Sequence, residues 1–154
     1  MNNEAHFHLM INHFPIILPI VGLIIIILGI VFKNDLVKRI AFGVLITGAL
    51  TAFMAMNSGE GAEEIVEELG RNHKLIHEHE EQAESFALLS YVLGLISVIA
   101  LWLNWKKHPF KGLSMYITML LTTIVLYFGK SAGTSGGEIT HEEIRSEISE
   151  EKGE

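Results

Sequence analysis

The sequence of 154 residues contains no cysteine. Disulfides, thiolate zinc sites, cysteine-ligated iron–sulfur clusters and c-type haem attachment are therefore excluded, because each needs cysteine sulfur. Basic residues are also few, with 11 Lys and Arg against 18 Asp and Glu and a formal net charge of −7. This balance argues against a nucleic-acid partner, since nucleic-acid binding depends on clustered positive charge. Any metal ion must be bound by imidazole, carboxylate, thioether or backbone groups.

Apolar residues are abundant, at 49% of the chain, and the mean hydropathy is +0.38. Four apolar runs of roughly 17–20 residues each match the thickness of a bilayer core. They cover residues 15–32, 37–56, 86–105 and 113–129. The first run is too long for a signal peptide and has no basic leader, so we expect it to be retained. The sequence predicts an all-α fold, an integral membrane four-helix bundle.

The basic residues indicate how this bundle is oriented. Six of the 11 lie in the loops after the first and third runs, where Asp35 is the one acid. These six are Lys33, Lys38, Arg39, Lys106, Lys107 and Lys111. By the positive-inside rule both loops face the cytoplasm. We therefore expect both termini and the long second loop on the outer side of a bacterial cytoplasmic (inner) membrane, in a multi-pass protein.

The segments outside the apolar runs divide the chain further. We assign residues 1–132 to the membrane bundle and residues 133–154 to an acidic outer tail. Within the second loop, the stretch "GAEEIVEELG" predicts a surface helix at about 60–70, closed by Gly70. Asn72 is the expected N-cap of a helix that begins near His73 and continues into the third run.

Histidines gather in the segments expected on the outer side. Seven of the eight lie there: His6, His8, His13, His73, His77, His79 and His141. His73 and His77 are four residues apart and share a helix face. Asn12 is a candidate N-cap that places His13 in the first turn of a helix held rigid by Pro15. We expect His6, His79 and His108 to be solvated.

Three chemistries fit these histidines. The first is a b-type haem, one or two, bound by an imidazole from each of two helices. We assign the metal ligands to His13 and His77, with His73 as a substitute and with His8 and His141 for a second haem or a supporting role. Candidate partners for the haem propionates are Arg71, Lys130 and Arg145. The second chemistry is copper or zinc binding by several histidines, and the third is a carboxylate–histidine proton relay.

The stretch "HLMINHFPI" adds a family resemblance. His8, His13, Phe14 and Pro15 resemble the "H-P-x-x-V-H-F-P" opening of bacterial four-span membrane proteins of the domain-of-unknown-function 2231 family. The likeness extends to His77 with Glu78 before the third run, and to Gly136, Gly137 and His141 after the fourth. Members look like companions of, or fusions to, cytochrome c or Rieske-type modules. The resemblance thus implies an electron-transfer setting.

From these observations we expect a membrane-bound b-type haem protein for electron transfer, or a haem-bearing subunit of a respiratory or redox complex. A cytochrome c-like or other redox subunit is the expected partner, in a dimer or a larger membrane complex. The alternatives are an outer-face copper- or zinc-binding protein, or a structural accessory subunit whose histidines contact lipid headgroups. Nothing defines a substrate pocket, so an electron carrier or subunit is favoured over a stand-alone enzyme.

Overall fold

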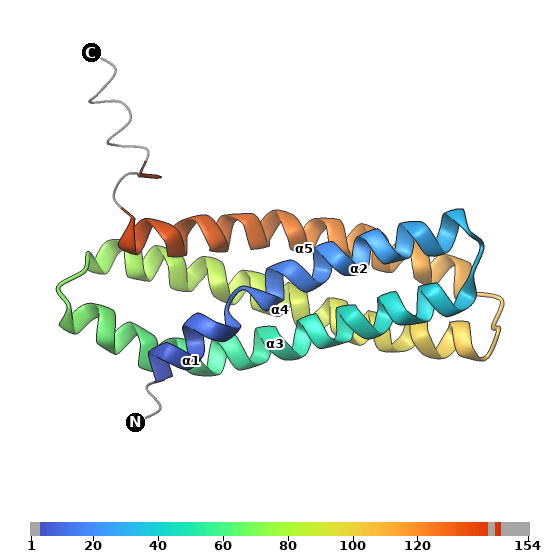
Figure 1. Ribbon diagram of the computed structural model, residues 1–154, viewed down its shortest axis with the longest axis horizontal. Helices are drawn as coiled ribbons and strands as arrows, with labels where there is room; N and C mark the ends of the chain where they lie inside the picture. Colours follow the sequence, from blue (N-terminus) through green and yellow to red (C-terminus); the bar gives the residue numbers. More distant parts are fainter. Residues whose placement is uncertain (1–3, 142–143, 146–154) are drawn as a thin grey trace, which may run out of the picture.

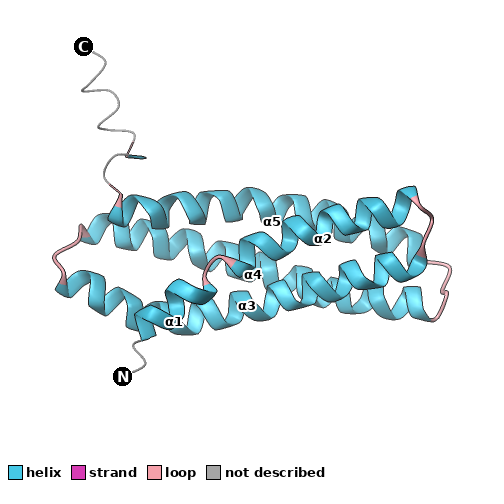
Figure 2. Ribbon diagram, in the orientation of Figure 1, coloured by secondary structure: helices cyan, strands magenta, loops and turns pink. Residues whose placement is uncertain are grey.

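The chain folds into five α-helices in a computed structural model that describes residues 4–141 and 144–145. The helices are α1 (Glu4–Ile11), α2 (Phe14–Val31), α3 (Asp35–Glu68), α4 (His73–Trp105) and α5 (Lys111–Thr140). A turn at Asn12 and His13 separates α1 from α2. Figure 2 shows that the loops between the long helices are short. The architecture is therefore all-helical over the described residues, as predicted.

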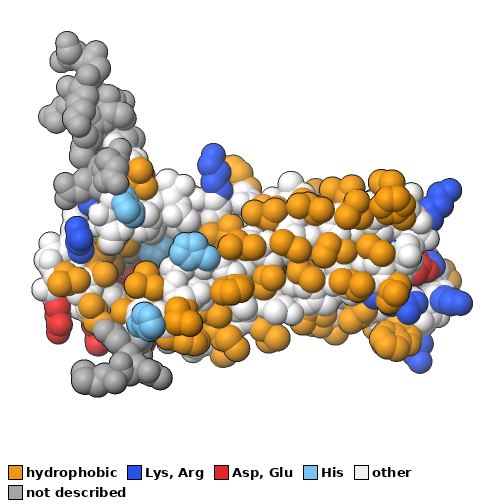
Figure 3. Space-filling view, viewed as in Figure 1, with side chains coloured by type: hydrophobic (Ala, Val, Ile, Leu, Met, Phe, Trp, Pro, Cys, Tyr) orange, Lys and Arg blue, Asp and Glu red, His pale blue; other side chains and the backbone are white. Residues whose placement is uncertain are grey.

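Four stretches are long and apolar enough to cross a membrane: Ala5–Val31, Asp35–Glu68, His73–Trp105 and Lys111–Thr140. Large apolar side chains remain exposed along all of them, for example Ile24, Leu50, Leu95 and Leu120. Figure 3 shows apolar side chains as a broad band over the middle and right of the viewed face. Exposure of such a band to water would be unfavourable, whereas the lipid chains of a bilayer give it an apolar environment. The prediction of a multi-pass membrane protein is confirmed.

The four long helices pack side by side in a closed ring. Contacts join α2 to α3, α3 to α4, α4 to α5, and α5 back to α2, while α1 packs on α3 (Figure 1). The loops α2–α3 and α4–α5 lie at one end of the bundle, and α1 lies with the α3–α4 turn at the other. We call the end with α1 the histidine end and the opposite one the basic end.

Small residues allow the helices to approach closely. The buried positions of α2 are Pro15, Pro19, Gly22, Ile26 and Gly29, spaced three or four residues apart along one face. A Cβ at Gly94 would lie 2.5 Å from the Cβ of Ala49, so α3 and α4 meet where no larger side chain fits. Close packing of small residues is the usual way in which membrane helices associate.

Helices α3, α4 and α5 extend further than the apolar runs. Helix α3 has 34 residues and is about 50 Å long, well beyond a bilayer core of about 30 Å. The predicted surface helix at about 60–70 is therefore not a separate element, because residues 60–68 are the last turns of α3. Helix α5 likewise continues to Thr140 and includes the first residues of the predicted tail. Residues 142–143 and 146–154 of that tail lie outside the described residues.

The end of α3 and the start of α4 were read correctly from the sequence. Gly70 has φ +74° and closes α3, and the Asn72 side chain accepts a hydrogen bond from the Lys74 backbone N–H at 2.9 Å. The expected cap of the first membrane helix is wrong. His13, and not Asn12, is the N-cap of α2, and no side chain caps that helix. The carboxamide oxygen of Asn12 is buried without a hydrogen-bond partner among the described residues.

Candidate ligand site at the histidine end

His8 on α1 lies against α3. Its ring is half-buried, and its Nδ1 lies 3.1 Å from the carbonyl oxygen of Ala55 and 3.1 Å from Oγ of Ser58. A carbonyl oxygen can only accept, so Nδ1 carries the proton in this arrangement. The Ser58 hydroxyl in turn donates to the Ala55 carbonyl at 3.1 Å, which leaves its oxygen to accept from the imidazole. These contacts hold the ring of His8 on α3.

His79 on α4 lies against α5 in the same way. Its ring is half-buried, and its Nδ1 lies 3.1 Å from Oγ of Ser135. The Ser135 hydroxyl donates to the carbonyl of Ala132 at 3.1 Å, and that carbonyl also interacts with the His79 ring. Because the Ser135 hydroxyl gives its hydrogen to Ala132, its oxygen accepts from the imidazole, and Nδ1 of His79 is the donor.

We call the residues that each histidine ring contacts on the neighbouring helix its seat. The two seats share one sequence pattern. Residues 55–59 read "AMNSG" and residues 132–136 read "AGTSG", so both follow A-x-x-S-G. In each, the serine and the alanine carbonyl one turn earlier contact an imidazole from another helix. The bundle thus consists of two helical hairpins, α1/α2–α3 and α4–α5, that present one histidine each at the same end.

The glycine of each pattern leaves room for the ring. A Cβ on Gly136 would lie 2.9 Å from Cε1 and 3.3 Å from Nδ1 of His79, which is too close. A Cβ on Gly59 would lie 3.8 Å from Cε1 of His8, an ordinary contact distance. The His79 ring therefore rests directly on the α5 backbone, and the His8 ring rests on α3 less tightly.

The second ring nitrogen, Nε2, is the atom through which His8 and His79 could bind a metal ion. In both rings the nitrogen that contacts the serine is Nδ1. Nε2 of each neutral imidazole consequently keeps a lone pair that can bind a metal ion. His8 and His79 are also near enough for their charges to interact. The two hairpins thus place two imidazoles at the same end of the bundle, and each is held through Nδ1.

This pair lies just outside the apolar runs. His79 precedes Phe86 by 7 residues, or about 10 Å of helix, and Ser58 follows Met56 by 2 residues. Figure 3 shows histidine side chains near the end that holds α1, beyond most of the apolar band. The site is therefore at the boundary between the apolar band and the polar end of the bundle.

The other predicted ligands lie differently. His13 is exposed at the start of α2. His73 is exposed and lies 3.3 Å from a carboxylate oxygen of Glu67. His77 is exposed, with Nδ1 at 3.4 Å from Glu80 and Nε2 at 3.6 Å from Glu81. His141 is exposed at the end of α5. The pairing of His13 with His77 stays a prediction.

The three expected propionate partners are dispersed. Arg71 is exposed in the α3–α4 turn, and Lys130 is exposed on α5. The Arg145 guanidinium donates to the carbonyls of Glu138 and Ile139 at 2.9 Å and 3.4 Å. Arg145 therefore caps the C-terminal turn of α5, a usual role for a basic side chain at that position.

The expectation that three histidines are solvated holds for His6 alone. His6 is exposed, but His79 is half-buried in its seat on α5. His108 at the basic end is also half-buried, with its ring centroid 5.4 Å from that of Phe110. Over the described residues, no three side chains of His, Asp or Glu are grouped as a metal site. Comparison with protein-family models, curated proteins and solved structures gives no match.

Proposed function

We propose that this membrane protein binds a b-type haem at the histidine end, where His8 and His79 would hold it through Nε2. The observation that supports this is the pair of half-buried imidazoles, one from each hairpin, each held through Nδ1 by a serine. A ligating histidine normally donates its other ring N–H to an oxygen acceptor, which fixes the ring and raises its basicity. The Nδ1 contacts of His8 and His79 with Ser58 and Ser135 match this arrangement.

The number of histidines favours haem over copper or zinc. A porphyrin supplies four nitrogen ligands, so a b-type haem needs one or two protein ligands. Protein zinc sites use three or four side chains, and copper sites commonly use three or more. The described residues place two imidazoles at the same end of the bundle and offer no group of three candidate ligands. The residues present therefore fit a haem better than a bare metal ion.

Electron transfer is the chemistry that this ligand set supports. A bound haem would supply one-electron chemistry at its iron. If His8 and His79 both held the haem iron, they would leave it to electron transfer, so a carrier or a haem-bearing subunit of a redox complex is favoured over an enzyme. The site at the edge of the apolar band is accessible to a partner from the polar side. A cytochrome c-like protein or another redox subunit is a suitable partner.

The orientation that we propose follows the positive-inside rule. The basic end faces the cytoplasm of a bacterial cell, and the histidine end with both termini faces outward. The chain has no cysteine, so single cysteines report the orientation directly. A membrane-impermeant maleimide added to intact spheroplasts should label Leu69→Cys in the α3–α4 turn and leave Lys107→Cys in the α4–α5 loop unlabelled. The reverse pattern would place the histidine end inside.

Spectroscopy of the purified protein tests the haem. We expect protein expressed with ample haem to show a Soret band and, after reduction, a sharp α band. His8→Ala and His79→Ala should each lose this spectrum. His13→Ala and His77→Ala should keep it, because neither side chain occupies a seat on another helix. Circular dichroism of every variant distinguishes loss of haem from loss of fold.

The same samples can contradict the proposal. If His13→Ala and His77→Ala lose the haem spectrum and His8→Ala keeps it, the haem ligands are His13 and His77, the pair predicted from the sequence. Copper or zinc without haem iron, by metal analysis, would favour the metal-binding alternative. Wild-type protein that contains neither haem nor copper or zinc would favour the accessory-subunit alternative. In that case the two histidines would have only a structural role.

A further inference from the structure

Positive charge is concentrated at the basic end. Both short loops lie there, with the six basic residues counted above and Asp35 as the one acid. Figure 3 shows lysine and arginine side chains over this end of the viewed face. The exposed aromatic residues Trp102, Trp105 and Phe110 lie at the same level, on the last turns of α4 and in the loop. Tryptophan and its aromatic relatives prefer the headgroup level of a bilayer, so this end meets lipid headgroups.

The two loops use lysine where the backbone favours glycine. Lys33 and Lys107 have φ of +50° and +52°, in the left-handed region. Each follows a helix end closed by the same pair of hydrogen bonds, from Lys33 to Ile30 and Asn34 to Gly29, and from Lys107 to Asn104 and His108 to Leu103. The third helix end of this type, at the histidine end, has Gly70 in that position. A side chain in this conformation is strained, and glycine is not. The strain at Lys33 and Lys107 therefore indicates a use for their charge.

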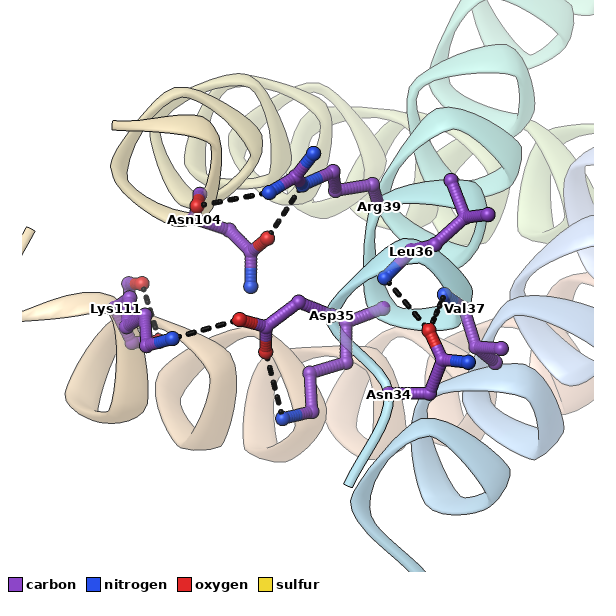
Figure 4. A network of polar contacts seen from close by, with 9 residues as sticks. Asn34, Asp35, Leu36, Val37, Arg39, Asn104 and Lys111 are labelled. Carbon is purple, nitrogen blue, oxygen red and sulfur yellow. Dashed lines mark hydrogen bonds and ion pairs between the residues drawn. The ribbon is translucent and has the colours of Figure 1, made fainter. Parts of the chain in front are cut away.

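A cleft between α3, α4 and α5 lies among these basic residues and could hold an anion. Its volume is about 290 Å³, and its polar lining includes Asp35, Lys38, Asn104 and Lys111. Asp35 binds Lys111 at 2.7 Å and Lys38 at 3.2 Å, so one carboxylate holds two ammonium groups side by side (Figure 4). One positive charge remains uncompensated in this group.

The rest of the lining suits a phosphate that carries an apolar chain. Pro109 and Met115 supply apolar surface, and Gly112 lines the cleft in the first turn of α5. No side chain caps the N-terminus of α5, and helix N-termini favour phosphate oxygens. Above the cleft, Arg39 donates to Asn104 Oδ1 at 2.8 Å and lies 5.5 Å from the Trp105 ring, which fixes a further cation (Figure 4).

We propose that the cleft at the basic end binds the phosphate of an anionic phospholipid headgroup, with Lys38 and Lys111 as its ligands and with Lys33 and Lys107 strengthening the attraction. Basic clefts between membrane helices at the headgroup level are suited to such lipids. This site is at the opposite end from the histidine pair and does not depend on the haem.

Fluorescence of the purified protein in detergent tests the proposal, because both tryptophans lie at the basic end. The probes are dioctanoyl phosphatidylglycerol, dioctanoyl phosphatidylcholine and inorganic phosphate. We expect phosphatidylglycerol to bind at least about tenfold more tightly than phosphatidylcholine, because several basic residues each contribute about fivefold near a membrane surface. It should also bind more tightly than inorganic phosphate, which has no apolar chain to contact Pro109 and Met115. Lys111→Gln should weaken phosphatidylglycerol binding by about fivefold. The matched control, Lys74→Gln at the histidine end, should leave the affinity unchanged.

The variant Lys33→Gly with Lys107→Gly serves as a second test that does not endanger the fold. It removes two positive charges while relieving two strained backbone positions, so weaker lipid binding with higher thermal stability is the expected result. Equal affinities for the two lipids would overturn the proposal. Inorganic phosphate binding as tightly as phosphatidylglycerol would show a site for a free anion, and overturn it too. An equal loss in Lys74→Gln would show general attraction to the protein and not this cleft.

Discussion

Replacing Gly136 by alanine tests whether the His79 seat is a ligand site. A Cβ at this position would lie 2.9 Å from Cε1 of His79, whereas ordinary contact begins at 3.4 Å. The ring must therefore move by at least the difference of 0.5 Å. Its hydrogen bond to Ser135, now 3.1 Å long, would be stretched or broken by such a shift. Gly136→Ala thus changes the orientation of His79 without removing the imidazole.

The effects on stability and on ligand binding should separate. A lost hydrogen bond costs about 1 kcal/mol, and alanine in place of a helical glycine returns up to about 1 kcal/mol. The free energy of unfolding should therefore change little. Loss of the group that orients a metal-binding histidine lowers affinity by about ten- to hundredfold. We expect haem affinity to fall within that range and the fold to remain intact.

The assay is a haem titration of the apoprotein followed at the Soret band, with circular dichroism as the measure of folding. Gly59→Ala is the matched control, since it changes the equivalent glycine of the other A-x-x-S-G pattern. Its Cβ would lie 3.8 Å from the His8 ring, so that variant should bind haem as the wild type does. Equal affinity in all three proteins would refute the proposed role of His79, as would an equal loss in both variants.

Four further outcomes can be measured by thermal unfolding in detergent or by amide exchange. Lys33→Gly and Lys107→Gly should each stabilise the fold by about 1 kcal/mol, because each relieves a left-handed lysine. Gly70→Ala should destabilise it by about 1 kcal/mol, since its φ is +74°. Asn72→Ala should cost about 1 kcal/mol and speed amide exchange in the first turn of α4. Ser97→Ala should leave stability within about 1 kcal/mol of wild type or raise it, because the Ser97 hydroxyl is buried without a hydrogen-bond partner in the described residues.

The membrane bundle could be predicted because its signal is local. Each apolar run exceeds the length that a bilayer core requires, and lipid demands helices with internally satisfied backbone groups. The turn at 69–72 was likewise predictable, since Gly70 and Asn72 act through their own backbone neighbours. The start of α2 was placed one residue early, because Asn12 is the better cap by residue type, whereas the helix begins after His13 without a side-chain cap.

The half-buried histidines were harder to predict because their burial depends on contacts between distant residues. His8 and Ser58 are 50 residues apart, and His79 and Ser135 are 56 apart. The spacing along α4 places His77 beside Glu80 and Glu81, and such carboxylates contact an imidazole on an exposed helix face as readily as in a binding site. The sequence therefore favoured the exposed His77 as a ligand. The missed signal is the repetition of A-x-x-S-G at 55–59 and 132–136, which marks two equivalent helix positions.

The lengths of the helices explain why the histidine pair lies at the boundary of the apolar band. Helices α3, α4 and α5 have 34, 33 and 30 residues, where about 20 would span the bilayer core. At the basic end the apolar runs reach almost to the loops, so the surplus turns lie at the histidine end. There the bundle continues in polar surroundings, and its interior can hold serines and imidazoles without the cost of placing them in hydrocarbon. A group bound between His8 and His79 would therefore be shielded by protein on its sides and remain within reach of a partner from the polar side.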